Sequence, residues 1–514
     1  MRGFTDPFFG YSFILRTLLY VVIPAFGVWQ FFRLKRAIHV FQLESYKRHW
    51  FARWCRVNKR RALFLGSPKD PKKPLAMTGR AWRMLVAGLV ISIFGVLLPS
   101  VFAHLALGGA PMDIVTFLVM MSLIFFGTWR VLLLADIAMT PVQSAINDRF
   151  LRRAKTKLKE VSPLVIGVTG SYGKTSTKMV IAALLGAPQE VLATPGSFNT
   201  TLGVSRTINE KLKVGHRFFV VEMGARQEGD IAEIASMVAP TVGVLTAIGP
   251  AHLESFGSLE SVRRAKSELI ESLPRGGTAV VNVDDPIVRE VVDNYTGPAT
   301  LVRYGLDAST RCDVSARDLL IIEEGTALTL VDHRSGAALP VRTKLLGRHA
   351  VGHVLAGVAV ALATGRELAD LGPAVAALEP APHRLQIIKG AGGVTVIDDA
   401  YNSNPSGAAA ALEVLKQIPG GKKIVVTPGM VELGDAQDDA NREFGRRAAE
   451  IADVLFIVAR LNRRALSDGA RSAGARCEVI EVDSLAEATR RFPEFVKAGD
   501  IVLFENDLPD QYEN

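Results

Sequence analysis

The chain has 514 residues, enough for about three domains. Hydrophobic residues make up 49% and charged residues 22%, which excludes a disordered or collagen-like chain. The three cysteines, Cys55, Cys312 and Cys477, lie far apart in the sequence, and none forms a Cys-x-x-Cys pair. This pattern argues against a zinc ribbon or a disulfide framework and indicates a reducing compartment.

The net charge of +9 comes from one segment of the chain. Residues 33–83 contain fifteen Lys or Arg and two acids, a net charge of +13, which leaves −4 for the rest. Aromatic residues lie among these cations. The mixture favours contact with an anionic membrane surface or with an acidic, lipid-linked substrate. Nucleic-acid binding is the rival interpretation, and we do not expect it for a segment that lies between two apolar stretches.

Three apolar stretches flank the basic segment, at residues 8–32, 84–107 and 114–135. Each has 22 residues or more, and about 20 are needed to span a bilayer. Buried core helices are the alternative, but a polybasic loop between the stretches favours membrane spans. The Lys and Arg bias places residues 33–83 in the cytoplasm. We therefore expect residues 1–135 to anchor the chain in the cell membrane by three transmembrane helices, with everything after residue 135 cytoplasmic.

After a linker at residues 136–160, the pattern changes to alternating strands and helices. We expect strands at residues 164–169, 218–223, 242–247 and 278–282, and helices at residues 174–185, 229–238 and 259–273. This alternation is typical of an α/β domain with a mostly parallel sheet. Polar turns between strands at residues 305–345 suggest a small antiparallel insert, followed by a helix at residues 350–363. The central domain is predicted to cover residues 161–379.

A second α/β unit begins near residue 380, where prolines interrupt a helical pattern. Its expected strands are residues 394–398, 423–427, 454–458, 478–482 and 501–504, and its helices begin near Ser406, Ala440, Asn462 and Ser484. The spacing predicts a Rossmann-like C-terminal domain at residues 380–514.

A glycine-rich loop lies between the first predicted strand, which ends at Thr169, and the first helix. It reads Gly170-Ser171-Tyr172-Gly173-Lys174-Thr175-Ser176. Such a loop lets backbone N–H groups surround phosphate at a helix N-terminus. Lys174 would neutralise phosphate charge, and the Thr175 hydroxyl would hold Mg²⁺. The full eight-residue spacing of this motif is not met, so a chance glycine turn is the alternative.

Three further residues follow predicted elements of the same domain. Glu222 ends an apolar strand, where a carboxylate faces the ligand crevice and usually holds Mg²⁺, although it could also cap the next turn. His252 lies on the loop after the following strand, where a ligand role and a structural role are both open. Lys266, by itself, reads as a solvated helix lysine.

Several motifs together carry a resemblance to a known family. They are the loop at residues 169–175, Phe198-Asn199-Thr200-Thr201-Leu202-Gly203, Glu222-Met223-Gly224-Ala225, residues 248–254, Ala265-Lys266-Ser267-Glu268, His383-Arg384-Leu385, residues 398–405 and residues 429–434. In this order and spacing, the sequence resembles the Mur ligases over about residues 160–510. It is most similar to the members that add D-Ala-D-Ala to a muramoyl tripeptide.

The resemblance implies an ATP- and Mg²⁺-dependent amide ligase of peptidoglycan or cell-wall biosynthesis. Such enzymes phosphorylate a substrate carboxylate to an acyl phosphate, which an amine then attacks. It also implies site residues. The implied catalytic residues are Lys174, Glu222, His252 and Lys266, and the implied metal ligands are Thr175, Glu222, His252 and a carbamylated Lys266. The residues implied to bind ATP are Thr169, Gly170, Ser171, Tyr172, Gly173, Lys174, Thr175, Ser176, His353, Arg384 and Asp399. Those implied to contact substrate are Asn199, Thr200, Asn402 and Asn404.

The sequence also departs from the family pattern. The usual N-terminal domain that binds UDP is not visible, and the segment expected to contact adenine reads His349-Ala350-Val351-Gly352-His353 without its asparagines. We therefore expect a cell-envelope peptide or lipid-linked precursor as one substrate and an amino acid or dipeptide as the other. The alternatives are a polymerase resembling the poly-γ-glutamate synthases, a membrane P-loop ATPase, and a catalytically silent scaffold.

Overall fold

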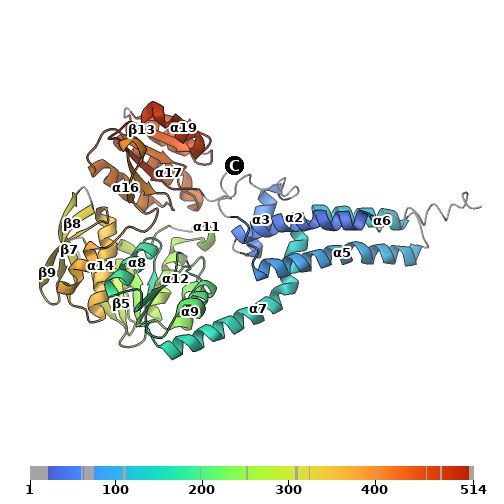
Figure 1. The fold of residues 1–514 in the computed structure, drawn as a ribbon, viewed down its shortest axis with the longest axis horizontal. Coiled ribbons are helices and arrows are strands. Elements are labelled where there is room, and N and C mark those ends of the chain that lie inside the picture. The colour runs from blue at the N-terminus through green and yellow to red at the C-terminus, as the bar shows by residue number, and fades with distance from the viewer. Residues whose placement is uncertain are drawn as a thin grey trace, which may run out of the picture. The chain divides into compact units, whose positions relative to one another are not determined.

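A computed structural model describes residues 21–508, except residues 45, 60–61, 63–73, 108–111, 197, 251–252, 307–310, 323–324, 402, 459 and 475–476. The described chain divides into two compact units, one ending at Asp148 and the other running from Arg149 to Leu508 (Figure 1). Two of the predicted site residues, His252 and Asn402, lie outside the described residues.

The first unit is built from helices α2 (Ile23–Leu43), α3 (Arg48–Val57), α5 (Gly79–Leu107), α6 (Met112–Phe126) and the beginning of α7 (Thr128–Val161). Helix α5 packs against both α2 and α6, and these three run alongside one another in Figure 1. Apolar side chains of α2, α3, α5 and α7 form its core, among them Leu34, Ile38, Phe41, Phe51, Leu85 and Leu132.

Polar side chains also connect these helices. The buried Gln30 of α2 donates to Ser92 of α5 over 3.1 Å. Asp136 of α7 accepts hydrogen bonds from Arg48 of α3 at 2.6 Å and from Arg80 of α5 at 2.9 Å. Buried polar groups in proteins are almost always paired in this way, so these contacts fix which helix faces meet.

The apolar stretch predicted as a third membrane span, residues 114–135, is not one straight helix. Its two parts, in α6 and α7, meet at an angle of 79°. Gly127 lies at the break, and a Cβ atom there would come within 2.6 Å of the Leu123 carbonyl oxygen. Because the residue has no Cβ, the backbone can bend sharply at this point. The predicted linker at residues 136–160 is also helical, since it belongs to α7.

By length and apolar composition, one described helix could cross a membrane. It is Gly79–Ala103, with a mean hydropathy of 2.5 and 22% of its most apolar window buried. A second qualifies if the bent pair Val115–Phe126 and Thr128–Val161 counts as one span. The first predicted stretch, residues 8–32, is described only from residue 21, at the start of α2.

The second unit contains a nine-stranded sheet in the order β2-β3-β1-β4-β5-β6-β7-β8-β9. Its strands are β1 (Leu164–Thr169), β2 (Val191–Ala193), β3 (Phe218–Glu222), β4 (Val242–Leu245), β5 (Thr278–Asn282), β6 (Thr300–Gly305), β7 (Val314–Ile322), β8 (Gly325–Asp332) and β9 (Ala337–Thr343). The pairs from β2 to β7 are parallel, and β7-β8-β9 is an antiparallel extension. The predicted insert is therefore part of the main sheet, because β7 pairs with β6 through Tyr304 and Val314.

Helices cover both faces of this sheet. They are α8 (Lys174–Leu185), α9 (Thr201–Lys211), α10 (Asp230–Val238), α11 (Leu253–Phe256), α12 (Leu259–Glu271), α13 (Pro286–Asp293), α14 (Gly347–Ala363) and α15 (Gly372–Ala376). The apolar core that includes α8 and α14 is separate from the one formed by α9, α10, α12 and the end of α7. The strands are buried and rich in β-branched residues, as expected for a parallel sheet that is covered on both sides.

A six-stranded sheet follows in the order β10-β11-β15-β12-β13-β14, with only β10 antiparallel to its neighbour. The strands are β10 (Gln386–Lys389), β11 (Thr395–Asp399), β12 (Lys423–Thr427), β13 (Val454–Val458), β14 (Glu478–Val482) and β15 (Ile501–Glu505). Helices α16 (Pro405–Gln417), α17 (Gln437–Ile451) and α18 (Arg463–Ser472) share one core, and α19 (Leu485–Phe495) packs in another.

Helices α17 and α18 approach each other through glycines. A Cβ atom on Gly469 would lie 1.9 Å from the Arg442 carbonyl oxygen, and one on Gly445 would lie 2.2 Å from that of Leu466. Neither distance is compatible with a side chain, so the two backbones must separate if either glycine is replaced. The tight crossing also fixes Asn441 of α17, whose amide bonds both the N–H and the carbonyl of Met430.

We expect Gly469→Ala to lower the free energy of unfolding by about 1–3 kcal/mol, the usual effect of overpacking. Gly352→Ala is the matched control, because a Cβ atom there meets nothing within 4 Å and Ala favours a helix interior over Gly. Thermal unfolding should show a lower midpoint for the first variant and an equal or higher one for the second. Equal midpoints for both variants would contradict the close crossing.

Candidate active site

The glycine-rich loop connects β1 to α8 as predicted, and its backbone requires glycine at two positions. Gly170 has a φ of +149°, and a Cβ atom there would lie 2.1 Å from the Thr246 hydroxyl. Gly173 has a φ of +77°, and a Cβ atom would meet the His353 ring at 2.6 Å. Gly173 is the N-cap of α8 and offers no side chain, so the N–H groups of the first turn remain available to an anion.

The hydroxyl of Thr175 points to the carboxylate of Glu222. It donates to Oε2 of Glu222 over 2.9 Å. The Lys174 amine instead donates to two carbonyls of its own loop, Gly170 at 2.6 Å and Ser171 at 3.1 Å. Burial lowers the pKa of Lys174 to about 8, against the opposing charge of Glu222. The lysine therefore lies within the phosphate loop, where an incoming anion would favour its charged form.

Glu222 is 1% exposed and accepts hydrogen bonds from three side chains. Besides Thr175, Lys178 donates to Oε2 over 3.0 Å and Asn199 donates to Oε1 over 3.0 Å. Burial alone would raise the pKa of Glu222, but the charge and hydrogen bond of Lys178, with Lys174 and Asn199, hold it below its usual value. The carboxylate is thus ionised and fixed at the carboxyl end of β3.

Lys266 lies on α12 and is 2% exposed. Burial, and next the charge of Lys174, hold its pKa well below the usual value for a lysine. Burial therefore favours the neutral amine, the form that reacts with carbon dioxide, over the charged form. Reading Lys266 as a solvated lysine from its local sequence was wrong, because the helix turns this position inward.

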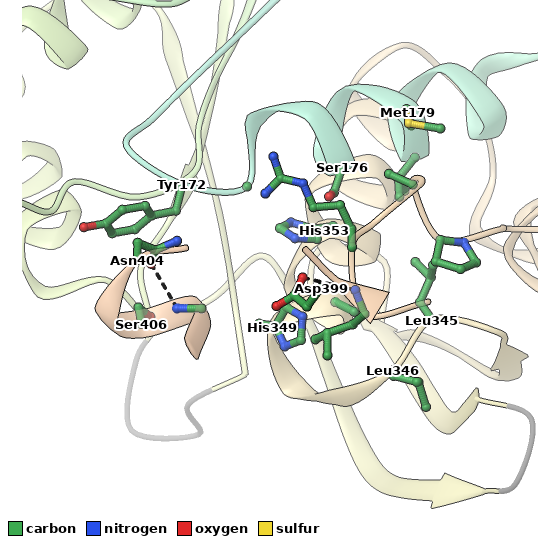
Figure 2. A pocket seen from close by; sticks show the side chains of 18 of the residues that line it. Tyr172, Ser176, Met179, Leu345, Leu346, His349, His353, Asp399, Asn404 and Ser406 are labelled. Carbon is green, nitrogen blue, oxygen red and sulfur yellow. Dashed lines mark hydrogen bonds between the residues drawn. The ribbon is translucent and has the colours of Figure 1, made fainter. Parts of the chain in front are cut away.

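A pocket lies between the phosphate loop, α14 and residues that follow β11 (Figure 2). It brings together six of the predicted nucleotide contacts with Asn404; the six are Tyr172, Gly173, Ser176, His353, Arg384 and Asp399. The guanidinium of Arg384 lies 4.5 Å from the centre of the Tyr401 ring. Burial raises the pKa of Asp399 to about 6, with Arg384 acting in the opposite direction.

His353 faces this pocket from α14, and Figure 2 labels it near His349 and Asp399. Its Nδ1 atom lies 3.0 Å from the Thr177 hydroxyl. Burial, and then the charges of His349 and Arg384, lower its pKa to about 3. The ring is therefore neutral at physiological pH, and its Nδ1 atom is already engaged by α8.

Other predicted residues have structural contacts. The Thr169 hydroxyl donates to the Met223 carbonyl over 3.0 Å, and the Ser171 hydroxyl donates to the Gly249 carbonyl over 3.0 Å. Thr200 and Asn404 are N-caps, of α9 and α16, and accept hydrogen bonds from the backbone three residues later. A capping role explains why these residue types occur there.

Some residues of the site were missed by sequence reasoning. Lys178 and Thr177 follow the phosphate loop on α8, and Glu505 ends β15 at the pocket. The signal for Lys178 was its position three residues after Thr175, which puts both on one face of a helix. Glu505 had no local signal, because its place at the pocket depends on β15 pairing beside β11.

Comparison with known proteins finds relatives that cover both sheets of the second unit. The description "Mur ligase middle domain" matches residues 168–361, and "Mur ligase, glutamate ligase domain" matches residues 383–505. The UDP-N-acetylmuramoyl-tripeptide–D-alanyl-D-alanine ligase of Mycobacterium leprae is 33% identical over 365 residues, covering 66% of this chain and 70% of that protein. The Bacillus subtilis enzyme of that name is 30% identical, covering 68% and 75%. The chain belongs to the Mur ligase family.

Solved structures agree with this assignment. MurF from Acinetobacter baumannii superimposes with a TM-score of 0.63 at 27% identity, over 71% of this chain and 78% of its own. MurF from Thermotoga maritima in complex with ADP gives 0.61 at 29% identity, over 70% and 80%. The protein is thus an ATP-dependent ligase with the Mur ligase α/β fold, and ATP and Mg²⁺ are its cofactors.

The residues present fit these cofactors. Thr175 and Glu222 supply two hard oxygen ligands of the kind that Mg²⁺ prefers, already 2.9 Å apart. Mg²⁺ usually keeps several waters and binds substrate phosphates, so these oxygens would add to the two protein ligands. The free first turn of α8 suits the phosphates of ATP.

Glu505 gives the pocket a testable pH dependence. It is 1% exposed and bonds the hydroxyls of Ser403 and Thr427. Burial raises its pKa to about 8, with Asp399 adding to the shift. Because the folded protein binds this proton more tightly than the unfolded chain, its contribution is complete at low pH and is lost as pH rises toward 8.

We therefore expect the thermal midpoint of the wild type to fall between pH 5.5 and 8.5 relative to that of Glu505→Gln, which mimics the protonated acid. The difference in the free energy of unfolding between the two proteins should change by up to about 1.4 kcal/mol per pH unit. Parallel curves for the two proteins across this range would show that Glu505 is ionised in the fold.

Proposed function

We propose that this Mur ligase activates the carboxylate of a cell-envelope peptide precursor and joins it to an amino acid or dipeptide. The observation that supports this most directly is the contact between Thr175 and Glu222, in the unit whose pocket also includes Arg384 and Asp399. The relatives' names identify UDP-N-acetylmuramoyl tripeptide and D-Ala-D-Ala as the first pair to test. A lipid-linked precursor is the second donor in this proposal, since the first unit is also proposed to contact lipid.

The proposed chemistry has two steps. A carboxylate oxygen of the donor attacks the γ-phosphorus of ATP, and ADP leaves with the electrons of the broken P–O bond. The amine, after losing a proton, attacks the acyl carbon, and inorganic phosphate leaves. Each step develops negative charge on phosphate oxygens, which positive groups stabilise.

We assign residues to these steps as follows. Lys174 and the first turn of α8 bind the β- and γ-phosphates, and Arg384 approaches the γ-phosphate. Asp399 holds the ribose, and His353 faces the base. Thr175 and Glu222 hold Mg²⁺, which offsets the charge of the phosphates.

Further ligands are proposed around a second Mg²⁺. Lys266 enters this set as a carbamate, since burial lowers the pKa of its amine and so favours the neutral form that reacts. His252 is the other ligand in this proposal. Asn199 orients Glu222 from the substrate-side loop, and Asn402 belongs to the substrate side of the C-terminal domain.

Phosphate release by the detergent-purified chain tests this function. We expect ATP-dependent release with UDP-muramoyl tripeptide plus D-Ala-D-Ala, or with a lipid-linked donor, and one new amide in the product mass. Lys266→Ala should reduce the rate by a factor of 100 or more, on the order of losing one charge-stabilising group. Added bicarbonate or short carboxylates, which can occupy the place of the lost carbamate, should restore this variant in part.

The outcomes separate the competing functions. Products with a range of chain lengths from a single amino acid would indicate a polymerase. Steady ATP hydrolysis that no donor or amine stimulates would indicate an ATPase. Full activity of Lys266→Ala would exclude the carbamate.

We also propose that the first unit anchors the enzyme in the cell membrane with the catalytic unit in the cytoplasm. Large apolar side chains of α5 and α6 are exposed in the folded protein, including Phe94, Leu98, Phe102, Leu118 and Leu123. Large apolar side chains exposed on neighbouring helices favour contact with lipid or another protein. Hydrogen bonds between helices, such as Gln30 to Ser92, are common where helices pack in a bilayer.

Because the chain bends sharply at Gly127, α7 is assigned separately from α6 in this proposal. Its first half exposes the apolar residues Leu134, Ile137, Val142 and Ile146, and Arg or Lys residues become frequent from residue 149. Exposed apolar side chains followed by cations are typical of a helix that lies in the membrane interface. We therefore assign α6 and the apolar parts of α2 and α5 to the bilayer and the first half of α7 to its cytoplasmic surface, where the basic segment at residues 33–83 also contacts anionic lipids.

Cysteine labelling in inner-membrane vesicles with their cytoplasmic face outward tests the anchor. In a chain with Cys55, Cys312 and Cys477 replaced by Ser, we expect Leu98→Cys to resist a water-soluble maleimide until detergent is added. Leu98 is 62% exposed in the folded protein, so only lipid or a partner would protect it. Val214→Cys, at a site 93% exposed in the catalytic unit, should react at once. Equal rates at both positions would contradict the anchor.

A further inference from the structure

Lys178 is a buried lysine beside the proposed metal ligands, with no part in the chemistry assigned so far. It is 2% exposed. Its amine donates to Oε2 of Glu222 over 3.0 Å and to the Gly196 carbonyl over 2.6 Å. A lysine is almost never buried to this degree unless it is paired. The ion pair is its partner here, with both side chains 2% exposed.

The position of Lys178 on α8 makes it a neighbour of the phosphate loop. Thr175 and Lys178, three residues apart, lie on one face of the helix and donate to the same carboxylate oxygen. The second partner, Gly196, belongs to the loop that also carries Asn199. Lys178 therefore connects the proposed metal carboxylate to the substrate-side loop.

The charge of this pair bears on metal binding. Glu222 and Lys178 together are neutral, so a divalent cation that approaches the carboxylate meets a positive charge in contact with it. Mg²⁺ sites in nucleotide enzymes commonly combine one or two carboxylates with substrate phosphates. The phosphates of ATP would supply the negative charge that the Glu222–Lys178 pair does not.

We propose that Lys178 is the resident counter-ion of Glu222, which keeps divalent metal from binding before the nucleotide and holds the Gly196 loop against the carboxylate. Metal then enters together with ATP. Lys178 is in this sense a positioning residue. The inference rests on the proposed function in one respect, the assignment of Glu222 as a metal ligand.

A purely structural ion pair predicts something different. If Lys178 only stabilises the fold, neutral variants lose stability, and added metal does not restore it. If Lys178 competes with metal, a divalent cation replaces the missing charge, and neutral variants gain both metal affinity and thermal stability from it. The nucleotide-free protein distinguishes the two cases.

The experiment is a Mn²⁺ titration of the detergent-purified full chain, with free Mn²⁺ measured by electron paramagnetic resonance, with and without ADP. We expect the wild type to bind Mn²⁺ tightly only with ADP. Lys178→Met should bind Mn²⁺ without ADP about tenfold more tightly than the wild type, within the usual range of coupling between two sites. Its thermal midpoint should rise with Mn²⁺, and that of the wild type should not.

Matched variants keep the test decisive. Lys178→Gln removes the charge but keeps hydrogen-bond donors, so it should behave like Lys178→Met even if that variant folds poorly. Lys157→Met removes another lysine that donates to a backbone carbonyl, that of Asn209, and should bind Mn²⁺ like the wild type. Adding Glu222→Gln to Lys178→Gln should abolish the gained affinity.

Two results have separate meanings. The role of Lys178 would be overturned if, without ADP, Lys178→Gln bound Mn²⁺ no more tightly than the wild type. Failure of the wild type to bind Mn²⁺ even with ADP would instead reject Glu222 as a metal ligand, and with it the proposed assignment of the site.

Discussion

The buried carboxylate of Glu222 is the constraint on which the catalytic unit depends. Parallel pairing of β3 with β1 brings this residue level with Val168, just before the phosphate loop. An ionised group at 1% exposure requires partners, and Thr175, Lys178 and Asn199 supply them from a helix and a loop. The same contacts that make the burial tolerable also fix the phosphate loop, the carboxylate and the substrate-side loop in one arrangement.

Much of this unit could be predicted from the sequence, because its strands are short β-branched runs and its phosphate loop has a distinctive glycine pattern. The expected strands at β1, β5, β12, β13 and β14 coincide with those found. Strands β2, β6, β9 and β10 were not predicted, since a run of three or four residues, or one that contains a charged residue or Pro340, carries little strand signal. Likewise, no local pattern shows that β7 continues the main sheet, because that pairing depends on residues far from the turn.

Site residues could be predicted where their role follows from a position at the end of a strand. They were harder to predict where the role depends on how helices pack. Glu222 and Thr175 meet as expected. Lys266 and Lys178 look like solvated lysines in sequence, and only the packing of α12 and α8 turns them inward. In the first unit, hydropathy located apolar helices but not the 79° bend at Gly127, where the absence of a Cβ atom matters more than apolar character.

The most direct test of this account is the position of the metal. Crystals of the protein grown with ADP and Mn²⁺ would give an anomalous scattering peak for each bound Mn²⁺. We expect a peak in contact with the Thr175 hydroxyl and the Glu222 carboxylate, at about 2.0–2.1 Å as for Mg²⁺ sites. A Mn²⁺ bound to the nucleotide but away from Glu222, with the Glu222–Lys178 pair unchanged, would contradict it.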